Sequence, residues 1–248
     1  MTDFVIGFIL SMLIGVLAYK KESLSESGVL TALVLGTLIF GFAGWFAFLV
    51  LILFFVLSSL ISNFNPDKKS SRRTAVQVLS NGLIATIAGM LYYVYGNFEF
   101  LVLLVASIAM AASDTWSSEI GRLSKNDPRH IFTFKVMKKG LSGGVSLLGF
   151  SASILAGIVF SALIFIITDQ LIYVFLVFIF AFLGSLIDTM LGTIQAKYRD
   201  LSTNEIVENQ YEGSIYYSGF TWISNNKVNL LSNLIGVLLL GVYLFYFI

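Results

Sequence analysis

The chain has 248 residues, of which 57% are hydrophobic and 12% charged, and its formal net charge is +1. A soluble domain of this length usually carries about 25% charged residues, so the composition indicates a polytopic membrane protein, built as one all-α helix bundle over residues 1–248. The absence of cysteine excludes disulfides and cysteine-ligated metal sites, and the single histidine excludes a multi-histidine metal site within one chain.

Eight apolar stretches follow one another along the chain, and each approaches the length of about 20 residues that spans a bilayer. The first stretch lacks the basic leader and cleavage pattern of a signal peptide, so we expect it to be retained as a span. The short sequence GFAG only weakly separates the second stretch from the third, so that pair is either a tight hairpin or a broken helix. The expected spans are residues 4–19, 27–42, 44–61, 74–95, 98–113, 144–167, 171–187 and 228–247.

The fifteen lysines and arginines all fall in loops on one face of the bundle if the chain has eight spans. The opposite face then carries only Asp3, Glu99 and Asp169 as charged residues. Because basic loops stay on the cytoplasmic side, we expect a multi-pass protein of the cell membrane with cytoplasmic basic loops and both termini outside. Seven or nine spans would distribute the positive charges over both faces.

The loop after the seventh stretch contains AKYRDLSTNEIVENQYEGSIYYSGFTWISNN, in which polar and β-prone residues alternate. This pattern predicts a small β-hairpin at the membrane surface of an otherwise all-α chain. The loops on the opposite face are only a few residues long, so we expect the protein to act mainly at its basic face.

Two aspartates end two of the expected spans: Asp114-Thr115 follows the fifth stretch and Asp188-Thr189 follows the seventh. Acidic side chains at membrane depth are costly and usually functional. The C-terminal end of a helix is negative, and Mg²⁺ typically binds through one or two carboxylates together with substrate phosphates. We therefore predict that Asp114 and Asp188 bind Mg²⁺; the alternative is that both are ordinary interfacial residues at helix ends.

Polar side chains also mark the N-terminal ends of the fourth, sixth and eighth spans, which start at the same face. Helix N-termini carry partial positive charge and free N–H groups, so they suit phosphate. Before the sixth span, KKGLSGGVS places two lysines next to a Gly-rich turn, although this is not a Walker motif. The alternatives are that the asparagines only form interhelical hydrogen bonds and that the basic residues serve topology alone. The residues concerned are Arg73, Gln77, Asn81, Lys138, Lys139, Gly143, Gly144, Asn226, Asn229 and Asn233.

Helical spacing predicts which side chains accompany the two aspartates. Gln195 shares a face with Asp188 if that helix continues far enough. Glu119 lies about 140° around a continuous helix from Asp114. Both acidic residues would therefore reach one site only if their helix ended near Trp116.

Five blocks of the sequence resemble conserved blocks of a known family: RRTAVQVLSNG, ASDTWSSEIG, GLSGGVSLLG, GSLIDTMLGTIQAKY and NNKVNLLSN. They are similar to the transmembrane-protein-nineteen-like integral membrane family, which includes plant phytyl-phosphate kinase. The blocks occur in family order over residues 72–233, which form the family core, whereas the N-terminal spans in 1–61 contribute little. A more distant resemblance is to CTP-dependent polyprenol and phytol kinases and to phosphatidate cytidylyltransferases.

This resemblance implies a kinase at the cytoplasmic membrane face that uses a nucleoside triphosphate, with CTP expected, and a prenyl monophosphate such as phytyl or geranylgeranyl phosphate. Asp114, Asp188 and Lys139 would be catalytic, and the two aspartates would bind Mg²⁺. Membrane lipids are further expected partners, and no nucleic acid is expected. The alternatives are a cytidylyltransferase that forms a CDP-lipid, a transporter, and a non-catalytic scaffold. The predicted substrate- and nucleotide-binding residues are Arg73, Gln77, Asn81, Ser117, Ser118, Glu119, Lys138, Gly143, Gly144, Gln195, Asn226, Asn229 and Asn233.

Overall fold

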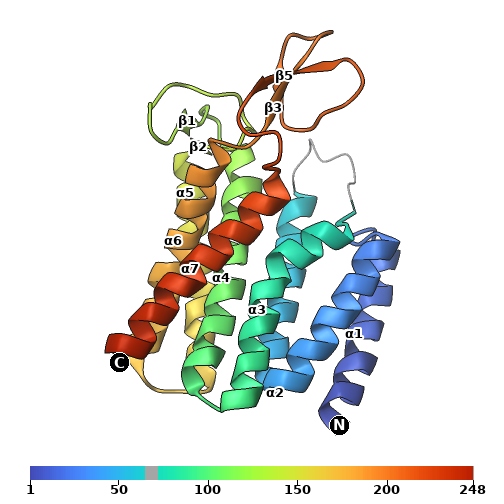
Figure 1. The fold of residues 1–248 in the computed structure, drawn as a ribbon, viewed down its shortest axis with the longest axis vertical. Helices are drawn as coiled ribbons and strands as arrows, with labels where there is room; N and C mark the ends of the chain where they lie inside the picture. The colour runs from blue at the N-terminus through green and yellow to red at the C-terminus, as the bar shows by residue number, and fades with distance from the viewer. Residues whose placement is uncertain (65–71, 248) are drawn as a thin grey trace.

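The computed structural model describes residues 1–64 and 72–247, and helices make up most of them (Figure 1). Seven helices of the described residues are long and apolar enough to cross a membrane, counting α5 together with the 3₁₀ turn η1 that extends it. This confirms the predicted all-α polytopic bundle. The helices are α1 (Thr2–Lys20), α2 (Glu26–Asn63), α3 (Ala75–Tyr95), α4 (Phe98–Arg122), α5 (Leu147–Ala162), η1 (Leu163–Ile166), α6 (Leu171–Gly192) and α7 (Asn225–Phe247).

Helix α2 folds back on itself at Gly44, where the backbone has φ +75° and ψ −170°. Glycine adopts such a positive φ without steric cost. Gly28, near the start of α2, packs against the carbonyl of Arg73, and Ser62, near its end, donates a hydrogen bond to Glu119 at 3.0 Å. Both ends of α2 thus lie at one end of the bundle, as Figure 1 shows. The expected eight crossings are therefore made by seven helices, because the second and third stretches form a tight hairpin.

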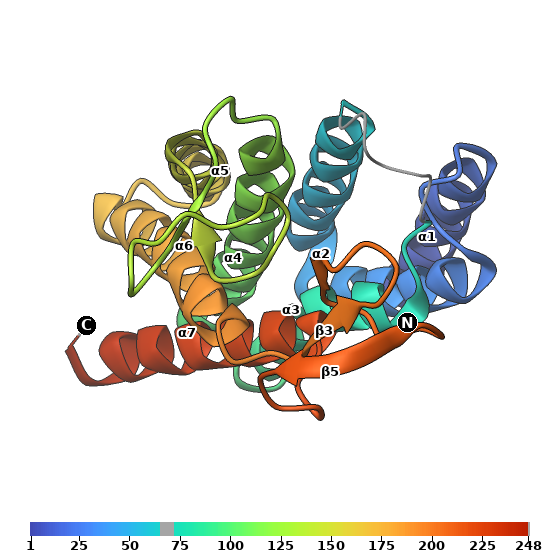
Figure 2. The ribbon, with the colours of Figure 1, turned by 90° about the horizontal axis from the view of Figure 1, so that it is seen from above.

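Helix α4 is the central element of the bundle. Its residues from Leu101 to Ser113 are all buried, as expected for a helix that is apolar on every side. It packs against α2, α3, α5, α6 and α7, and in the view from above it lies between α2 and α5 (Figure 2). Asp114 follows this buried run directly and so lies at the edge of the core.

Two small antiparallel sheets lie above the same end of the bundle (Figure 1). In the connection from α4 to α5, strand β1 (Arg129–His130) pairs with β2 (Gly144–Val145). The connection from α6 to α7 holds a three-stranded sheet in the order β4-β3-β5, so the predicted hairpin has one strand more than expected. Its strands are β3 (Lys197–Asp200), β4 (Ile206–Val207) and β5 (Ser214–Ser218).

The expected start of the sixth span at Gly144 was wrong by three residues. Gly144 and Val145 pair with β1, so they cannot be helical. Helix α5 begins at Leu147, after the N-cap residue Ser146, whose hydroxyl accepts a hydrogen bond from the Gly149 amide at 3.1 Å.

The two chain termini lie at the end of the bundle opposite the sheets (Figure 1). The long connections with most of the basic residues lie at the sheet end; Lys68 and Lys69 fall outside the described residues. This agrees with the expected gathering of positive charge on one face. That this face is cytoplasmic stays a prediction.

Candidate active site

A polar cavity of about 500 Å³ opens at the end of the bundle that carries the two sheets. Its walls come from the first turns of α3 and α7, the last turns of α4 and α6, and the two long connections. Ser146 and Gly149 add the first turn of α5. The sequence predicted three helix N-termini and two helix C-termini at one face, and the structure brings all five ends to one cavity.

The two predicted aspartates lie in side-chain contact with each other on the wall of this cavity. Asp188 is only 8% exposed, and Asp114 is half-buried. Ser232 on α7 donates its hydroxyl to Asp188 Oδ2 at 2.9 Å. Because two carboxylates in contact repel each other unless a proton or cation lies between them, the pair provides a position for a positively charged ligand.

Small residues on α6 and α7 let three helices approach one another one turn below the aspartates. Met110 lies four residues before Asp114, and Gly184 lies four residues before Asp188. A Cβ atom on Gly184 would come within 2.5 Å of Met110 Cγ, and one on Gly236 of α7 would come within 2.6 Å of Met110 Sδ. Met110 therefore occupies the space that the two glycines leave, and this packing sets the separation of the helices that carry the aspartates.

The two Asp-Thr pairs have the same local geometry. Thr115 Oγ1 donates to Ala111 O at 2.8 Å, and Thr189 Oγ1 donates to Ser185 O at 3.0 Å. Each hydroxyl is thus satisfied one turn back along its own helix. Neither threonine hydroxyl donates to the aspartate beside it.

Asparagines connect Asp188 with the N-terminal turns of α7 and α3. With its amide nitrogen turned toward acceptors, Asn229 donates to Asp188 Oδ2 at 3.2 Å and to the Asn225 carbonyl at 2.9 Å. Asn81 on α3 lies beside the same side chain, since in the other orientation of the amide Asn229 Nδ2 donates to Asn81 Oδ1 at 3.4 Å. Asn81, Asn226 and Asn229 all line the cavity, as the sequence analysis expected of a site.

Arg73 adds a positive charge just before the start of α3. Its backbone is fixed to the turn between α1 and α2, because Arg73 N donates to Ser23 O at 3.0 Å and Ser25 N donates to Arg73 O at 3.1 Å. The guanidinium lies over the ring of Phe55, with Cζ 6.0 Å from the ring centroid. Burial lowers the pKa of Arg73, and the nearby Glu119 carboxylate acts in the opposite direction. An arginine guanidinium keeps its proton in proteins, so Arg73 supplies a positive charge here.

Glu119 also lines the cavity, although α4 continues for three residues beyond it. The prediction that Asp114 and Glu119 reach one site only if the helix ends near Trp116 was therefore wrong. The cavity surrounds the exposed end of α4, so residues on two sides of the helix contribute to it. Ser117 and Ser118 line the same cavity.

The Gly-rich turn before α5 forms part of the cavity wall, together with Lys139. Gly143 has φ +89°, and a Cβ atom there would come within 2.8 Å of Thr193 Cγ2. A side chain at this position would therefore be strained and would collide with the end of α6. Gly144 lies beside it as the first residue of β2.

Glu208, directly after β4, is a cavity residue that the sequence analysis missed. It accepts hydrogen bonds from the amide of Ser142 and, at 3.2 Å, from the Ser142 hydroxyl. Burial lowers the pKa of the Lys197 ammonium on β3, and the Glu208 carboxylate acts in the opposite direction. Glu208 therefore joins the two long connections at the cavity. No sequence pattern distinguished Glu208 from Glu205 and Glu212 in the same polar loop. The cavity residues Asn209, Ser224 and Asn225 were missed for the same reason.

Three predicted site residues lie outside the cavity. Lys138 forms an ion pair with Glu205, which precedes β4. Gln195 is only 1% exposed and pairs with Phe220 through an isolated parallel bridge. The predicted helical face does not reach Gln195, because α6 ends at Gly192.

Asn233 is the third of these residues, and it forms hydrogen bonds between two helices. Its Oδ1 accepts from Ser107 Oγ at 2.7 Å, and its Nδ2 donates to Ser107 O at 2.8 Å, so it joins α7 to α4. Gln77 does line the cavity, but its Oε1 accepts from Thr74 N at 2.9 Å as part of the capping box of α3. That oxygen is therefore engaged in the cap.

The donor set suits Mg²⁺ bound together with a phosphorylated substrate. Within residues 1–64 and 72–247, no group of three or more His, Asp or Glu side chains lies close enough to hold a metal ion. Mg²⁺ usually takes one or two carboxylates and completes its shell with phosphate oxygens and water. Asp114 and Asp188 are two such carboxylates, and the cavity of about 500 Å³ leaves space beside them.

Comparison with known proteins places the chain among integral membrane proteins. The family model described as "Integral membrane protein DUF92" matches residues 9–237. The chain belongs to the DUF92 family. This membership confirms the family resemblance of the five sequence blocks and shows that the protein is an integral membrane protein.

Three relatives illustrate the range of this DUF92 protein's similarities. It is 32% identical over 267 residues to Protein PGR of Arabidopsis thaliana, covering 93% of this chain and 92% of that protein. It is 25% identical over 229 residues to Protein VTE6, chloroplastic, of the same plant, covering 86% of this chain and 63% of that protein. It is 35% identical over 157 residues to an uncharacterized membrane protein of Methanocaldococcus jannaschii, covering 60% of this chain and 66% of that protein. No solved structure matches the chain.

Proposed function

We propose that this DUF92 protein is a membrane kinase that transfers the γ-phosphoryl group of a nucleoside triphosphate, with CTP the expected donor, to a prenyl monophosphate. The observation that carries the proposal is the contact between Asp114 and Asp188 inside a polar cavity at the end of the bundle. The two substrates differ in phase, since the prenyl chain stays in the bilayer while the nucleotide is water-soluble. A cavity at the membrane edge is the place where their phosphates can meet.

The reaction joins two phosphates without a covalent role for the protein. A phosphate oxygen of the prenyl monophosphate attacks the γ-phosphorus, and the bond from that phosphorus to the β–γ bridging oxygen breaks. The products are a prenyl diphosphate and a nucleoside diphosphate. A phosphomonoester has a second pKa of about 6, so the attacking group is already largely ionised near neutral pH and needs no strong general base.

The residues of the cavity would position the phosphates and neutralise their charge. Asp114 and Asp188 would hold Mg²⁺, which would supply positive charge to neutralise the phosphates. Lys139 and the backbone at Gly143 and Gly144 would hold the nucleotide phosphates. Arg73, which lines the cavity just before the start of α3, would hold the lipid phosphate.

The hydrogen bonds to Asp188 give the site its fixed geometry. Ser232 and Asn229 both donate to Oδ2, so they orient the carboxylate that would help to hold the metal. The N-termini of α3, α5 and α7 add partial positive charge around the same space. A scaffold protein would not need acids and asparagines from separate helices to converge in this way.

Labelled CTP separates the proposed kinase from a cytidylyltransferase built from the same parts. Detergent-purified protein is incubated with Mg²⁺, geranylgeranyl monophosphate and CTP labelled at either the α- or the γ-phosphorus, and the lipid products are separated. We expect the γ-label in a lipid diphosphate and the α-label in CDP. The α-label in the lipid, with release of diphosphate, would replace the kinase with a cytidylyltransferase. No labelled lipid with CTP or any other nucleoside triphosphate would contradict both reactions.

A further inference from the structure

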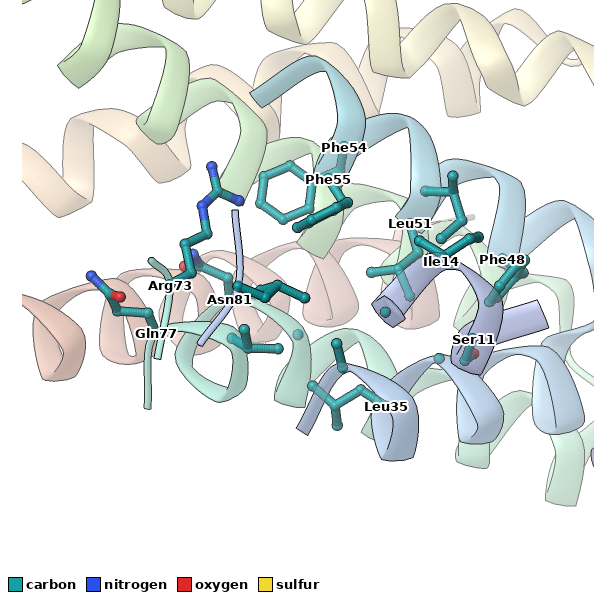
Figure 3. Close-up of a pocket in the computed structure, with 17 residues that line it drawn as sticks. Ser11, Ile14, Leu35, Phe48, Leu51, Phe54, Phe55, Arg73, Gln77 and Asn81 are labelled. Carbon is teal, nitrogen blue, oxygen red and sulfur yellow. The ribbon is translucent and has the colours of Figure 1, made fainter. Parts of the chain in front are cut away.

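A second cavity, shown in Figure 3, is apolar, and it shares lining residues with the polar cavity. It has a volume of about 70 Å³ and lies between α1, the two halves of α2, and α3. Its walls include Ile14, Leu35 and Leu51. We call this space the apolar groove.

The apolar groove joins the polar cavity at one end. Arg73, Gln77 and Asn81 line both spaces. Figure 3 shows these three side chains together at one end of the groove and Ser11 and Phe48 at the other. Among the described residues that line the groove, Arg73 is the one with a charge. A ligand that occupies both spaces therefore needs an anionic head and an apolar body.

The depth of the apolar groove can be measured along α1. Ser11 lies nine residues before Lys20, the last residue of α1, and the turn that follows α1 is hydrogen-bonded to Arg73 at the polar cavity. At 1.5 Å per residue, this corresponds to about 14 Å. The hydrocarbon core of a bilayer is about 30 Å thick, so the groove reaches about halfway across it.

Two glycines keep the apolar groove narrow. Gly36 on α2 packs directly against the hydroxyl of Ser11, and a Cβ atom on Gly82 of α3 would come within 2.8 Å of Leu35 Cδ1. These contacts hold α1, α2 and α3 close together. The remaining space, about 70 Å³, is too small for the two chains of a glycerolipid, and a single chain fills it by pushing the lining side chains apart.

We propose that the apolar groove binds the single prenyl chain of the lipid phosphate, with the phosphate at Arg73 and the first 14 Å or so of the chain between α1, α2 and α3. The proposal rests on the kinase function proposed above and specifies where the chain of its lipid substrate binds. Chain beyond Ser11 and Phe48 lies outside the groove, in the bilayer. Affinity therefore rises with chain length until the groove is filled and then stays level.

Photolabelling tests the location of the chain without any need for catalysis. The probe is geranylgeranyl monophosphate with a diazirine on its prenyl chain, and labelled peptides are identified by mass spectrometry. We expect labels on α1, α2 and α3, reduced by excess geranylgeranyl monophosphate more strongly than by phosphatidate or geranylgeraniol. Labels confined to α5, α6 and α7, or equal competition by phosphatidate, would overturn the assignment.

Substitutions on two walls of the groove provide the second test. Ala32→Phe and Ile52→Trp place large side chains in the groove, whereas Val34→Phe and Val56→Trp place them on lipid-facing positions that are 56% and 40% exposed. We expect the groove variants to raise the KM for geranylgeranyl monophosphate about tenfold or more, which is about 1.4 kcal/mol of lost binding. The controls should stay within about twofold, and the KM for CTP should not change in any variant.

The outcomes separate the two proposals. Kinase activity with equal effects of groove and control variants would overturn the groove and leave the kinase standing. Competed labelling of α1, α2 and α3 without any phosphorylated product would overturn the kinase and support lipid-phosphate binding in the groove. No labelling above that of Ala32→Phe protein would overturn the groove whatever the activity.

Discussion

Gly184 on α6 lies so close to Met110 on α4 that a Cβ atom on residue 184 would come within 2.5 Å of Met110 Cγ. Each of these residues lies one turn below an aspartate of the site. The contact therefore links helix packing in the core to the distance between Asp114 and Asp188.

Gly184→Ala should push α6 away from α4 and separate the two carboxylates. Because a displacement of about 1 Å in a catalytic group can cost about 100-fold in rate, we expect kcat to fall at least about tenfold in a folded protein. Met110→Ala in the same chain removes the collision and should restore part of the activity. Gly241→Ala is the matched control, since its Cβ would meet Leu103 at an ordinary 3.6 Å. Full activity of Gly184→Ala would contradict the packing argument.

Asn229 and Asn233 lie one turn apart on α7 but should respond differently to alanine. Asn233 bonds Ser107 inside the bundle, so Asn233→Ala should lower thermal stability, by about 0.6–2 kcal/mol, with little change in kcat. Asn229 contacts Asp188 in the cavity, so Asn229→Ala should lower kcat with little change in stability. Thermal melts and steady-state kinetics on the two proteins check both expectations. A loss of kcat in Asn233→Ala and a loss of stability in Asn229→Ala would contradict both expectations.

Glu208 should hold the loop with Lys139 in place through its bonds to Ser142. We expect Glu208→Ala to raise the KM for the nucleotide about tenfold and to speed proteolysis of the 138–144 loop, because a charged acceptor for two donors is lost. Glu205→Ala is the control, since its ion pair with Lys138 is exposed and such pairs contribute little. Equal effects of the two substitutions would show that Glu208 has no special role.

Much of the site was predictable because it depends on helix ends and on charge. The positions of Lys and Arg predicted which ends of the spans share one face. The ends that carry Asp114 and Asp188 were therefore expected beside the starts of α3, α5 and α7, where the structure places them. The inferences from helix ends and from charge hold even when the span boundaries are wrong by a few residues.

What could not be predicted depends on local packing and on loops. Asn233 and Asn229 are indistinguishable by periodicity, and only the neighbouring Ser107 shows that Asn233 is internal. Gln195 does not lie on the predicted helical face with Asp188, because α6 ends at Gly192. The apolar groove requires the reversal of α2 at Gly44, which the sequence left open between a hairpin and a broken helix.

Membrane orientation is directly measurable, since the native chain has no cysteine. Single cysteines at Asn126 and Asn204, in the two long connections, should react in intact cells only with a membrane-permeant reagent, as expected of a cytoplasmic face. A cysteine at Asn97, at the opposite end, should react with an impermeant reagent. Reaction of Asn126→Cys or Asn204→Cys from outside would contradict the proposed cytoplasmic site.

The central claim is that Asp114 and Asp188 act as one metal-binding unit in phosphoryl transfer. Its most direct test is the rate of γ-phosphoryl transfer from CTP to geranylgeranyl monophosphate by folded Asp114→Asn, Asp188→Asn and double-mutant proteins at saturating substrate. Each single change keeps the size of the side chain and removes a carboxylate, so each should reduce the rate by about 100-fold or more, and the double mutant should be little worse than either. Near-native rates in both single mutants would contradict the metal site and, with it, the proposed kinase.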